Sequence, residues 1–218
     1  MANVGATLKN KGNLLRVKRK VQKPTAKTRV LARKKAERIF ERAKKDLINS
    51  FKNHPVTQEI QTWPNSSNSS GTLGGYGNLF SYIGFAAGAN PIATVLAALE
   101  DGVEMEKRAV EKKVGKFFEF AFNIKIPTMN VLSALTPMPW ESGRSWVIGI
   151  ERGISGFGSY MYDHVYADKY GRSGTGFLAK KSPRHDSLQK IRPGGFRNIK
   201  YMSELILKFH KRLRASTK

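Results

Sequence analysis

The clearest pattern of apolar and polar positions in this chain is the strict alternation within residues 116–126, which read KFFEFAFNIKI. Gly115 precedes this stretch and Pro127 follows it, so both of its ends are marked by residues that interrupt regular structure. Positions of period two share one face of an extended chain, and that face would hold Phe118, Phe120, Phe122, Ile124 and Ile126. Aromatic and β-branched side chains suit a half-buried pleated surface. The pattern predicts the central strand of an antiparallel sheet, with its aromatic face in the core.

Two segments show the apolar spacing of amphipathic helices. The first is expected from about Arg29 to Phe51, with Thr28 as its N-cap. Its apolar stripe consists of Ala36, Ile39, Phe40, Ala43, Leu47 and Phe51. The second is expected from about Asn198 to Arg214. Its apolar stripe consists of Met202, Leu205, Ile206, Phe209 and Leu213. Both helices are expected to pack on the sheet.

Shorter elements are predicted between these landmarks. The segments Leu79–Phe85 and Ser145–Ile150 are brief apolar runs of the kind that form strands. A short helix is expected to begin after Asn90, which fits the N-cap position. Residues 102–114 fit either a continuation of that helix or a charged strand, and we favour a strand that turns at Gly115 into the central strand.

These elements predict an α+β fold, with an antiparallel sheet packed by a long N-terminal helix and a C-terminal amphipathic helix. Residues 1–28 lack periodicity and are rich in charge, so we expect a flexible basic arm that becomes ordered on a partner. Residues 29–218 are expected to form a single domain. Two long loops would interrupt this domain, a Ser/Asn/Gly-rich loop at 57–77 and a Gly/Tyr-rich excursion at 153–176.

Positive charge is concentrated at the two ends of the chain. The formal net charge is +23, and residues 1–52 hold 17 Lys and Arg against 3 Asp and Glu. Residues 180–218 hold 12 against 2, whereas residues 53–179 hold 10 against 11. Clustered Lys and Arg displace counterions from phosphates, so this distribution predicts contact with a polyanion, although a solvated surface would also carry such charge. DNA, RNA and an acidic protein remain open as that partner.

Particular basic residues are the best candidates for this contact. They lie in the N-terminal arm, on the first long helix and at the C-terminus: Arg16, Lys18, Arg19, Lys20, Arg33, Arg38, Arg42, Arg212 and Arg214.

No pattern in the sequence indicates catalysis, and we expect neither an enzyme, nor a metal site, nor a cofactor. The chain has no Cys, and its four His residues lack the spacing of metal ligands. Asp163, His164 and Asp168 are close in sequence, but a hydrogen-bonded His explains them more simply. The most apolar stretch, residues 83–99, is too short and too interrupted for a membrane span, and no secretory signal is visible. We therefore expect a soluble protein that is made in the cytosol.

Three groups of residues carry a resemblance to a known family. The first helix leads into Ser70-Gly71-Thr72-Leu73 and then to Ile83-Gly84-Phe85. A second match is Gly153-Ile154-Ser155-Gly156-Phe157-Gly158, followed by Arg172-Ser173-Gly174-Thr175-Gly176. The third is Phe196-Arg197-Asn198-Ile199 before the last helix. Over roughly residues 30–214 this arrangement resembles the minor tail, neck and tail-completion proteins of tailed bacteriophages. The long basic arm and the extended 57–77 loop depart from that family.

The resemblance implies a virion structural protein that is made in the host cytoplasm. Such proteins form rings, commonly of six or twelve copies, at the head–tail junction or at a tail end, and double-stranded DNA passes through the lumen. The implied partners are other copies of the chain, neighbouring neck or tail proteins, and DNA, with no membrane. Subunit contacts would use the two long loops, with Trp63, Leu73, Tyr76, Phe157, Tyr160 and Tyr162 as candidates. The alternatives are a basic RNA- or DNA-binding module acting as a monomer or small oligomer, and an enzyme with an unrecognised site.

Overall fold

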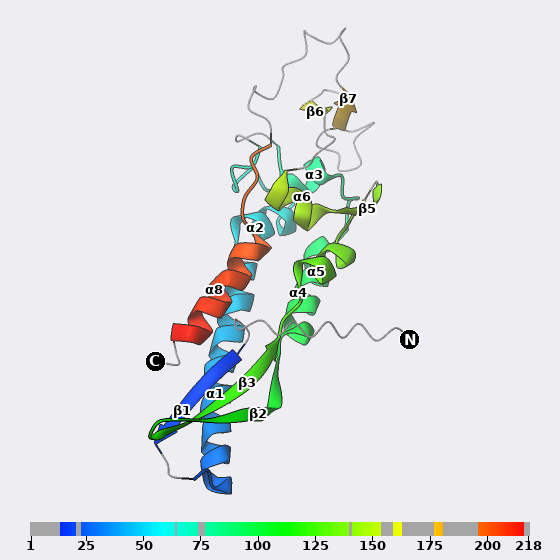
Figure 1. The fold of residues 1–218 in the computed structure, drawn as a ribbon. Helices are drawn as coiled ribbons and strands as arrows, with labels where there is room; N and C mark the ends of the chain where they lie inside the picture. Colours follow the sequence, from blue (N-terminus) through cyan, green and yellow to red (C-terminus); the bar gives the residue numbers. More distant parts are fainter. Residues whose placement is uncertain are drawn as a thin grey trace. The chain divides into compact units, whose positions relative to one another are not determined.

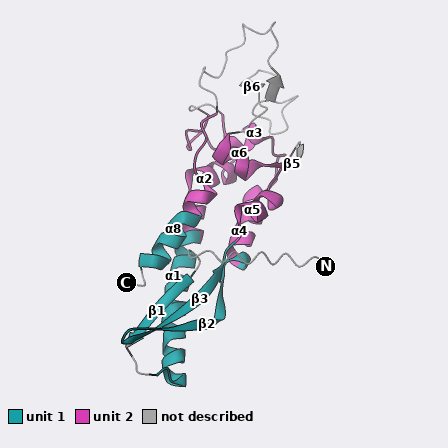
Figure 2. Cartoon of the chain, viewed as in Figure 1, with its two compact units in different colours: residues 1–47, 101–126, 206–218 teal, residues 48–100, 127–205 magenta. Residues whose placement is uncertain are grey.

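The structure is a computed structural model that describes residues 14–20, 23–63, 65–73, 77–139, 141–153, 159–162, 177–180 and 196–215 (Figure 1). The long N-terminal helix, the antiparallel sheet and the C-terminal helix are all present, which confirms the predicted α+β class. The chain forms two compact units (Figure 2). Unit 1 consists of residues 1–47, 101–126 and 206–218, and unit 2 consists of residues 48–100 and 127–205. This differs from the single domain that the sequence predicts after residue 28.

The sheet of unit 1 is built around the strand that the sequence predicts to be central. Strand β3 (Phe117–Lys125) lies between β1 (Leu14–Lys20) and β2 (Glu104–Val114), and both pairings are antiparallel. On its inner face Phe120, Phe122 and Ile124 are buried, as the alternation predicts. The β2–β3 turn is at Gly115, whose φ of +59° lies in the left-handed region that favours glycine. The predicted hairpin is therefore confirmed.

Strand β1 corrects the prediction of a flexible arm for residues 14–20. Leu15 pairs with Phe122 and Val17 pairs with Phe120, so the apolar residues of β1 extend the inner face of the sheet. Both side chains are buried. The reason is that this basic segment alternates apolar and charged residues at period two, which suits the edge of a sheet whose other face is exposed.

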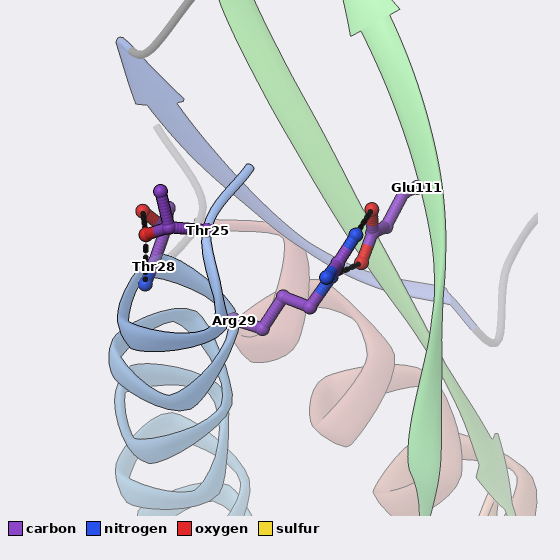
Figure 3. A network of polar contacts seen from close by, with 4 residues as sticks. All are labelled: Thr25, Thr28, Arg29 and Glu111. Atoms are coloured by element: carbon purple, nitrogen blue, oxygen red, sulfur yellow. Dashed lines mark hydrogen bonds and ion pairs between the residues drawn. The ribbon is translucent and has the colours of Figure 1, made fainter. Parts of the chain in front are cut away.

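Helix α1 (Ala26–Lys52) supplies the second layer of unit 1. Its buried residues in this unit are Ala32, Ala36, Phe40, Ala43 and Leu47, and Phe209 and Leu213 from the last helix, α8 (Met202–Ala215), are buried as well. The helix begins earlier than predicted, because Thr25 takes the capping position that the sequence assigns to Thr28. The backbone N–H of Thr28 donates to Thr25 Oγ1 at 3.2 Å (Figure 3).

Unit 2 is mainly helical. It contains α2 (Pro55–Gln61), α3 (Leu79–Ile83), most of α4 (Pro91–Gly102), α5 (Met129–Leu135), α6 (Trp146–Arg152) and the first turn of α8. A small hairpin joins β4 (Pro137–Met138) to β5 (Glu141–Ser145). A second antiparallel pair joins β6 (Ser159–Tyr162) to β7 (Phe177–Lys180). The helix predicted after Asn90 is confirmed, since Asn90 Oδ1 accepts from Ala93 N.

Two predicted strands are helices, and their caps explain the difference. Residues 79–83 form α3, in which Asn78 accepts a hydrogen bond from Ser81 N and Gly84 ends the helix with φ +86°. Residues 146–152 form α6, in which Ser145 Oγ accepts from Ile148 N at 3.2 Å. A short apolar run does not by itself distinguish a buried strand from a buried helix. Here the polar residue before each run satisfies an N-terminal amide and so selects the helix.

Candidate nucleic-acid interface

Almost all of the net positive charge belongs to unit 1. This unit holds 27 Lys and Arg against 8 Asp and Glu, so the difference gives it a formal charge of +19. Unit 2 holds 12 against 8, a difference of +4. The fold thus gathers the basic N-terminal segment, the hairpin and the basic C-terminal helix into one unit. Unit 1 is therefore the basic body on which a polyanion would be held, whereas residues 180–205 of the basic C-terminal end belong to unit 2.

The solvent-facing side of α1 carries a line of cations, with exposed Val30 and Leu31 on the same side of the helix. Lys27, Lys34, Arg38 and Lys45 are separated by 7, 4 and 7 residues, each close to a whole number of turns, so they line up along the helix axis. All four are exposed, and they lie opposite the buried stripe centred on Ala36. Within the described part of the chain none of the four forms an ion pair. We call these four residues the α1 cation line.

Of the three α1 residues chosen from the sequence, one is neutralised within the helix. Arg33 Nε contacts Glu37 Oε1 at 2.7 Å, an i,i+4 pair. Arg38 and Arg42 are exposed and have no ion-pair partner among the described residues, so they keep their predicted availability for an anion. Lys27, Lys34 and Lys45 were not selected from the sequence, although a helical projection of residues 26–52 would have found them.

A further arginine of α1 has a structural role. Arg29 donates from Nε and a terminal nitrogen to the two carboxylate oxygens of Glu111 on β2, at 2.6 and 3.1 Å (Figure 3). Glu111 raises the pKa of Arg29 through this hydrogen bond and its negative charge. This bidentate pair fastens the first turns of α1 to the sheet.

The four candidates from the predicted arm lie in strand β1. Arg16 contacts Glu119 Oε1 of β3 at 2.6 Å, and Glu119 is only 7% exposed. Lys18 is exposed and Arg19 is half-buried, while the side chain of Lys20 lies outside the described residues. Arg16 neutralises the largely buried carboxylate of Glu119, so its positive charge stabilises the sheet and is less available to an external anion. These residues are therefore fixed parts of a sheet edge.

The two C-terminal candidates also interact with other groups of the protein. Arg212 contacts Asp46 of α1 at 2.9 Å. Arg214 is exposed and interacts with other groups of the protein, and its charge contributes, after burial, to lowering the pKa of His210. Both arginines lie in the last turn of α8, where cations suit the helix dipole.

The outer face of the sheet carries charges of both signs. It holds Glu104, Glu119 and Lys125 together with exposed Lys18 and Lys112. Val110, Val114 and Phe117 add apolar area to the same face and are 62%, 42% and 44% exposed. Carboxylates on this face disfavour phosphate, in contrast to the α1 cation line.

Two of the predicted subunit-contact residues can be placed from the 57–77 loop. Leu73 is 3% exposed within unit 2, which removes it as a subunit contact. Trp63 is half-buried, and its ring stacks on Phe80 with centroids 4.6 Å apart. Tyr76 and Phe157 lie outside the described residues. Tyr160 and Tyr162 belong to β6, and their side chains are likewise outside the description.

Much of that loop is anchored by a buried carboxylate, which sequence reasoning missed. Glu59 of α2 is fully buried. Its Oε1 accepts from Asn68 Nδ2 at 2.8 Å and from Leu79 N at 2.7 Å, and its Oε2 accepts from Ser70 N at 2.9 Å. Asn68 Oδ1 in turn accepts from Leu73 N at 2.8 Å. We call Glu59 and its three donors the Glu59 cluster. The described parts of the loop are thereby fixed to α2.

Other site chemistries find no support in the described residues. No group of three or more His, Asp or Glu side chains in those residues could hold a metal ion. Asp163, His164 and Asp168 lie outside the description. In the same part of the chain, every helix is too short or too polar to cross a lipid bilayer.

No protein-family model, no curated protein and no solved structure matches this chain.

Proposed function

We propose that this chain is a virion structural protein of a tailed bacteriophage, which assembles into a ring at the neck or tail end through whose lumen double-stranded DNA passes. One observation carries the proposal: the net positive charge is concentrated in one unit, +19 against +4. In a ring of identical subunits, such segregation provides a basic surface for DNA and a second, nearly neutral surface for contacts between proteins. The resemblance of the sequence to neck and tail-completion proteins supports the same assignment.

The proposed partners follow from that architecture. Six or twelve copies would form the ring, and other neck or tail proteins would stack against it. DNA binding would be independent of sequence, because an exposed line of cations contacts phosphates and no base edges. The protein would be made in the host cytoplasm and would reach its final place in the virion.

Negative-stain microscopy of the purified full chain, at low and moderate salt, tests the assembly. Uniform rings with a central hole are the expected result, and light scattering of the same sample gives the number of copies. Mass spectrometry of purified virions from the phage that encodes the chain should find the protein at a fixed copy number. Its absence from virions, together with a monomer under all conditions, would refute the proposal.

The second candidate is a nucleic-acid-binding module that acts as a monomer or small oligomer. The α1 cation line favours it, because those four side chains are accessible in a single chain without any assembly. This candidate predicts salt-sensitive binding of nucleic acid by the monomer, with no rings at any protein concentration. Microscopy and binding on the same preparation therefore separate the two candidates.

A further inference from the structure

The cations of unit 1 differ in how strongly other groups of the protein already engage them. Arg16, Arg29, Arg33 and Arg212 each contact a carboxylate. An arginine in such a pair must share or break that contact before it can hold a phosphate. The α1 cation line has no such competition among the described residues. Phosphates would therefore bind first along α1.

The dimensions of the line suit a nucleic-acid backbone. From Lys27 to Lys45 the helix rises about 27 Å, at 1.5 Å per residue. Duplex DNA advances 3.4 Å per base pair, so the line spans roughly eight base pairs. Exposed Lys35 and Arg42 flank it on one side, and a single carboxylate without a described ion pair, Glu41, lies beside it. The surface is long and narrow, its charge is nearly of one sign, and exposed Val30 and Leu31 add some apolar area to it.

The opposite side of unit 1 is a poorer anion surface. The outer face of the sheet mixes lysines with the carboxylates of Glu104 and Glu119 and with exposed valine and phenylalanine. The negative charges of these carboxylates would weaken the binding of a phosphate there. DNA binding by these two outer surfaces of unit 1 can therefore be compared within the same protein.

We propose that the solvent-facing side of α1 is a binding site for the phosphate backbone of duplex DNA, with Lys27, Lys34, Arg38 and Lys45 as its contacts. The proposal deepens the proposed function, and it rests on that function's claim that the protein meets DNA. It assigns the DNA-facing surface of the ring subunit to α1, one of the three regions that the sequence offers beside the N-terminal segment and the C-terminus. Strand β1 then has a structural role in the sheet.

The salt dependence of binding gives the expected size of the effect. Each phosphate neutralised contributes about −0.9 to the slope of log K against log salt concentration for duplex DNA. Four contacts therefore contribute roughly −3.6 to the slope. If DNA binding depended only on the overall charge of the protein, removal of any four cations would change this slope by the same amount.

The experiment compares two full-length variants with the same loss of charge. The α1 variant replaces Lys27, Lys34, Arg38 and Lys45 with glutamine, and the sheet variant does the same at Lys18, Lys107, Lys112 and Lys125, which are all exposed. Binding to a dye-labelled 20-base-pair duplex is followed by fluorescence anisotropy at several salt concentrations. Circular dichroism confirms that both variants are folded. We expect the slope of the α1 variant to become shallower by about 3 to 4, and that of the sheet variant by less than about 1.

A third variant tests the same surface by removing a negative charge, which should strengthen DNA binding. Glu41→Gln removes the carboxylate beside the cation line, so it should strengthen duplex binding. Glu104→Gln on the sheet should leave binding unchanged. Equal effects at both positions would point to the overall charge alone and would overturn the assignment to α1.

The remaining outcomes are equally decisive. If the α1 variant binds like the wild type, or if both quadruple variants lose the same slope, the site on α1 is refuted. Displacement of the duplex by poly-glutamate at equal charge concentration would also refute a phosphate site. If rings form and the α1 variant binds DNA as the wild type does, the proposed function stands and the site on α1 is refuted. A wild-type protein that binds no duplex would overturn the site and the DNA contact together.

Discussion

The Glu59 cluster offers the sharpest test of what holds unit 2 together. Glu59 lies on α2 and has no exposed surface, and its carboxylate accepts three N–H groups from residues 9, 11 and 20 positions further along the chain. Replacing Glu59 with glutamine keeps the size of the side chain. It turns one acceptor oxygen into an NH2 donor. A donor would then face the N–H of Ser70, or those of Asn68 and Leu79.

The magnitude follows from the groups left without a partner. Hydrogen bonds to a charged group contribute about 1.5–3 kcal/mol, and a buried donor left unpaired costs about 1–3 kcal/mol. The substitution also removes the unfavourable burial of a charge, which offsets part of this loss. We expect Glu59→Gln to lower the free energy of unfolding by about 2–4 kcal/mol. Glu59→Ala leaves all three donors unpaired and should lower it further.

The assay combines urea unfolding with amide hydrogen exchange. The amides of Ser70 and Leu79 donate directly to Glu59 and should lose protection selectively. At 1.4 kcal/mol for each factor of ten, a loss of 2 kcal/mol corresponds to about 30-fold faster exchange. Glu41→Gln, an exposed acid on α1, serves as the matched control and should change neither quantity. Unchanged protection at both amides, with a free energy within about 0.5 kcal/mol of the wild type, would show that the cluster contributes nothing.

Three further predictions concern stability. Burial and the charge of Arg214 lower the pKa of His210, so the unfolded chain binds more protons below pH 6.5, and stability should fall on acidification from about that pH. Urea midpoints at pH 7.5 and 5.5 should therefore differ less in His210→Gln than in the wild type. Gly115→Ala, which forces a side chain to φ +59° with no atom nearby to clash, should cost about 1–2 kcal/mol in chemical denaturation. Tyr201→Phe removes the partner of the buried Thr57 hydroxyl, 2.6 Å away, and should cost about 1–3 kcal/mol, which a second change of Thr57 to valine should partly restore.

The candidate site was only partly predictable from the sequence. Lys and Arg could be counted, and the amphipathic pattern of α1 already separates a buried side from an exposed one. The long-range ion pairs could not be predicted, because Arg16 and Glu119 are 103 residues apart and Arg29 and Glu111 are 82 apart. The pairing of β1 with β3 brings Arg16 to Glu119, and the packing of α1 against the sheet brings Arg29 to Glu111. The structure therefore changed which of the cations are available to a partner.

The sequence by itself determined the features that depend on local periodicity. The alternation of residues 116–126, the apolar stripe of α1 and that of α8 follow from side-chain spacing within one segment, as does the turn at Gly115. The α+β class follows from the order of these elements.

The tertiary structure decided what depends on distant partners. It made residues 14–20 an edge strand, in which Leu15 and Val17 pair with Phe122 and Phe120 of β3 and are buried with them on the inner face of the sheet. It fixed described parts of a polar loop through Glu59, whose partners lie up to 20 residues away. It also brought basic segments from both ends and the middle of the chain into one unit. Burial and the long-range charge pairs are properties of the folded contacts, and no short window of sequence contains both halves of such a contact.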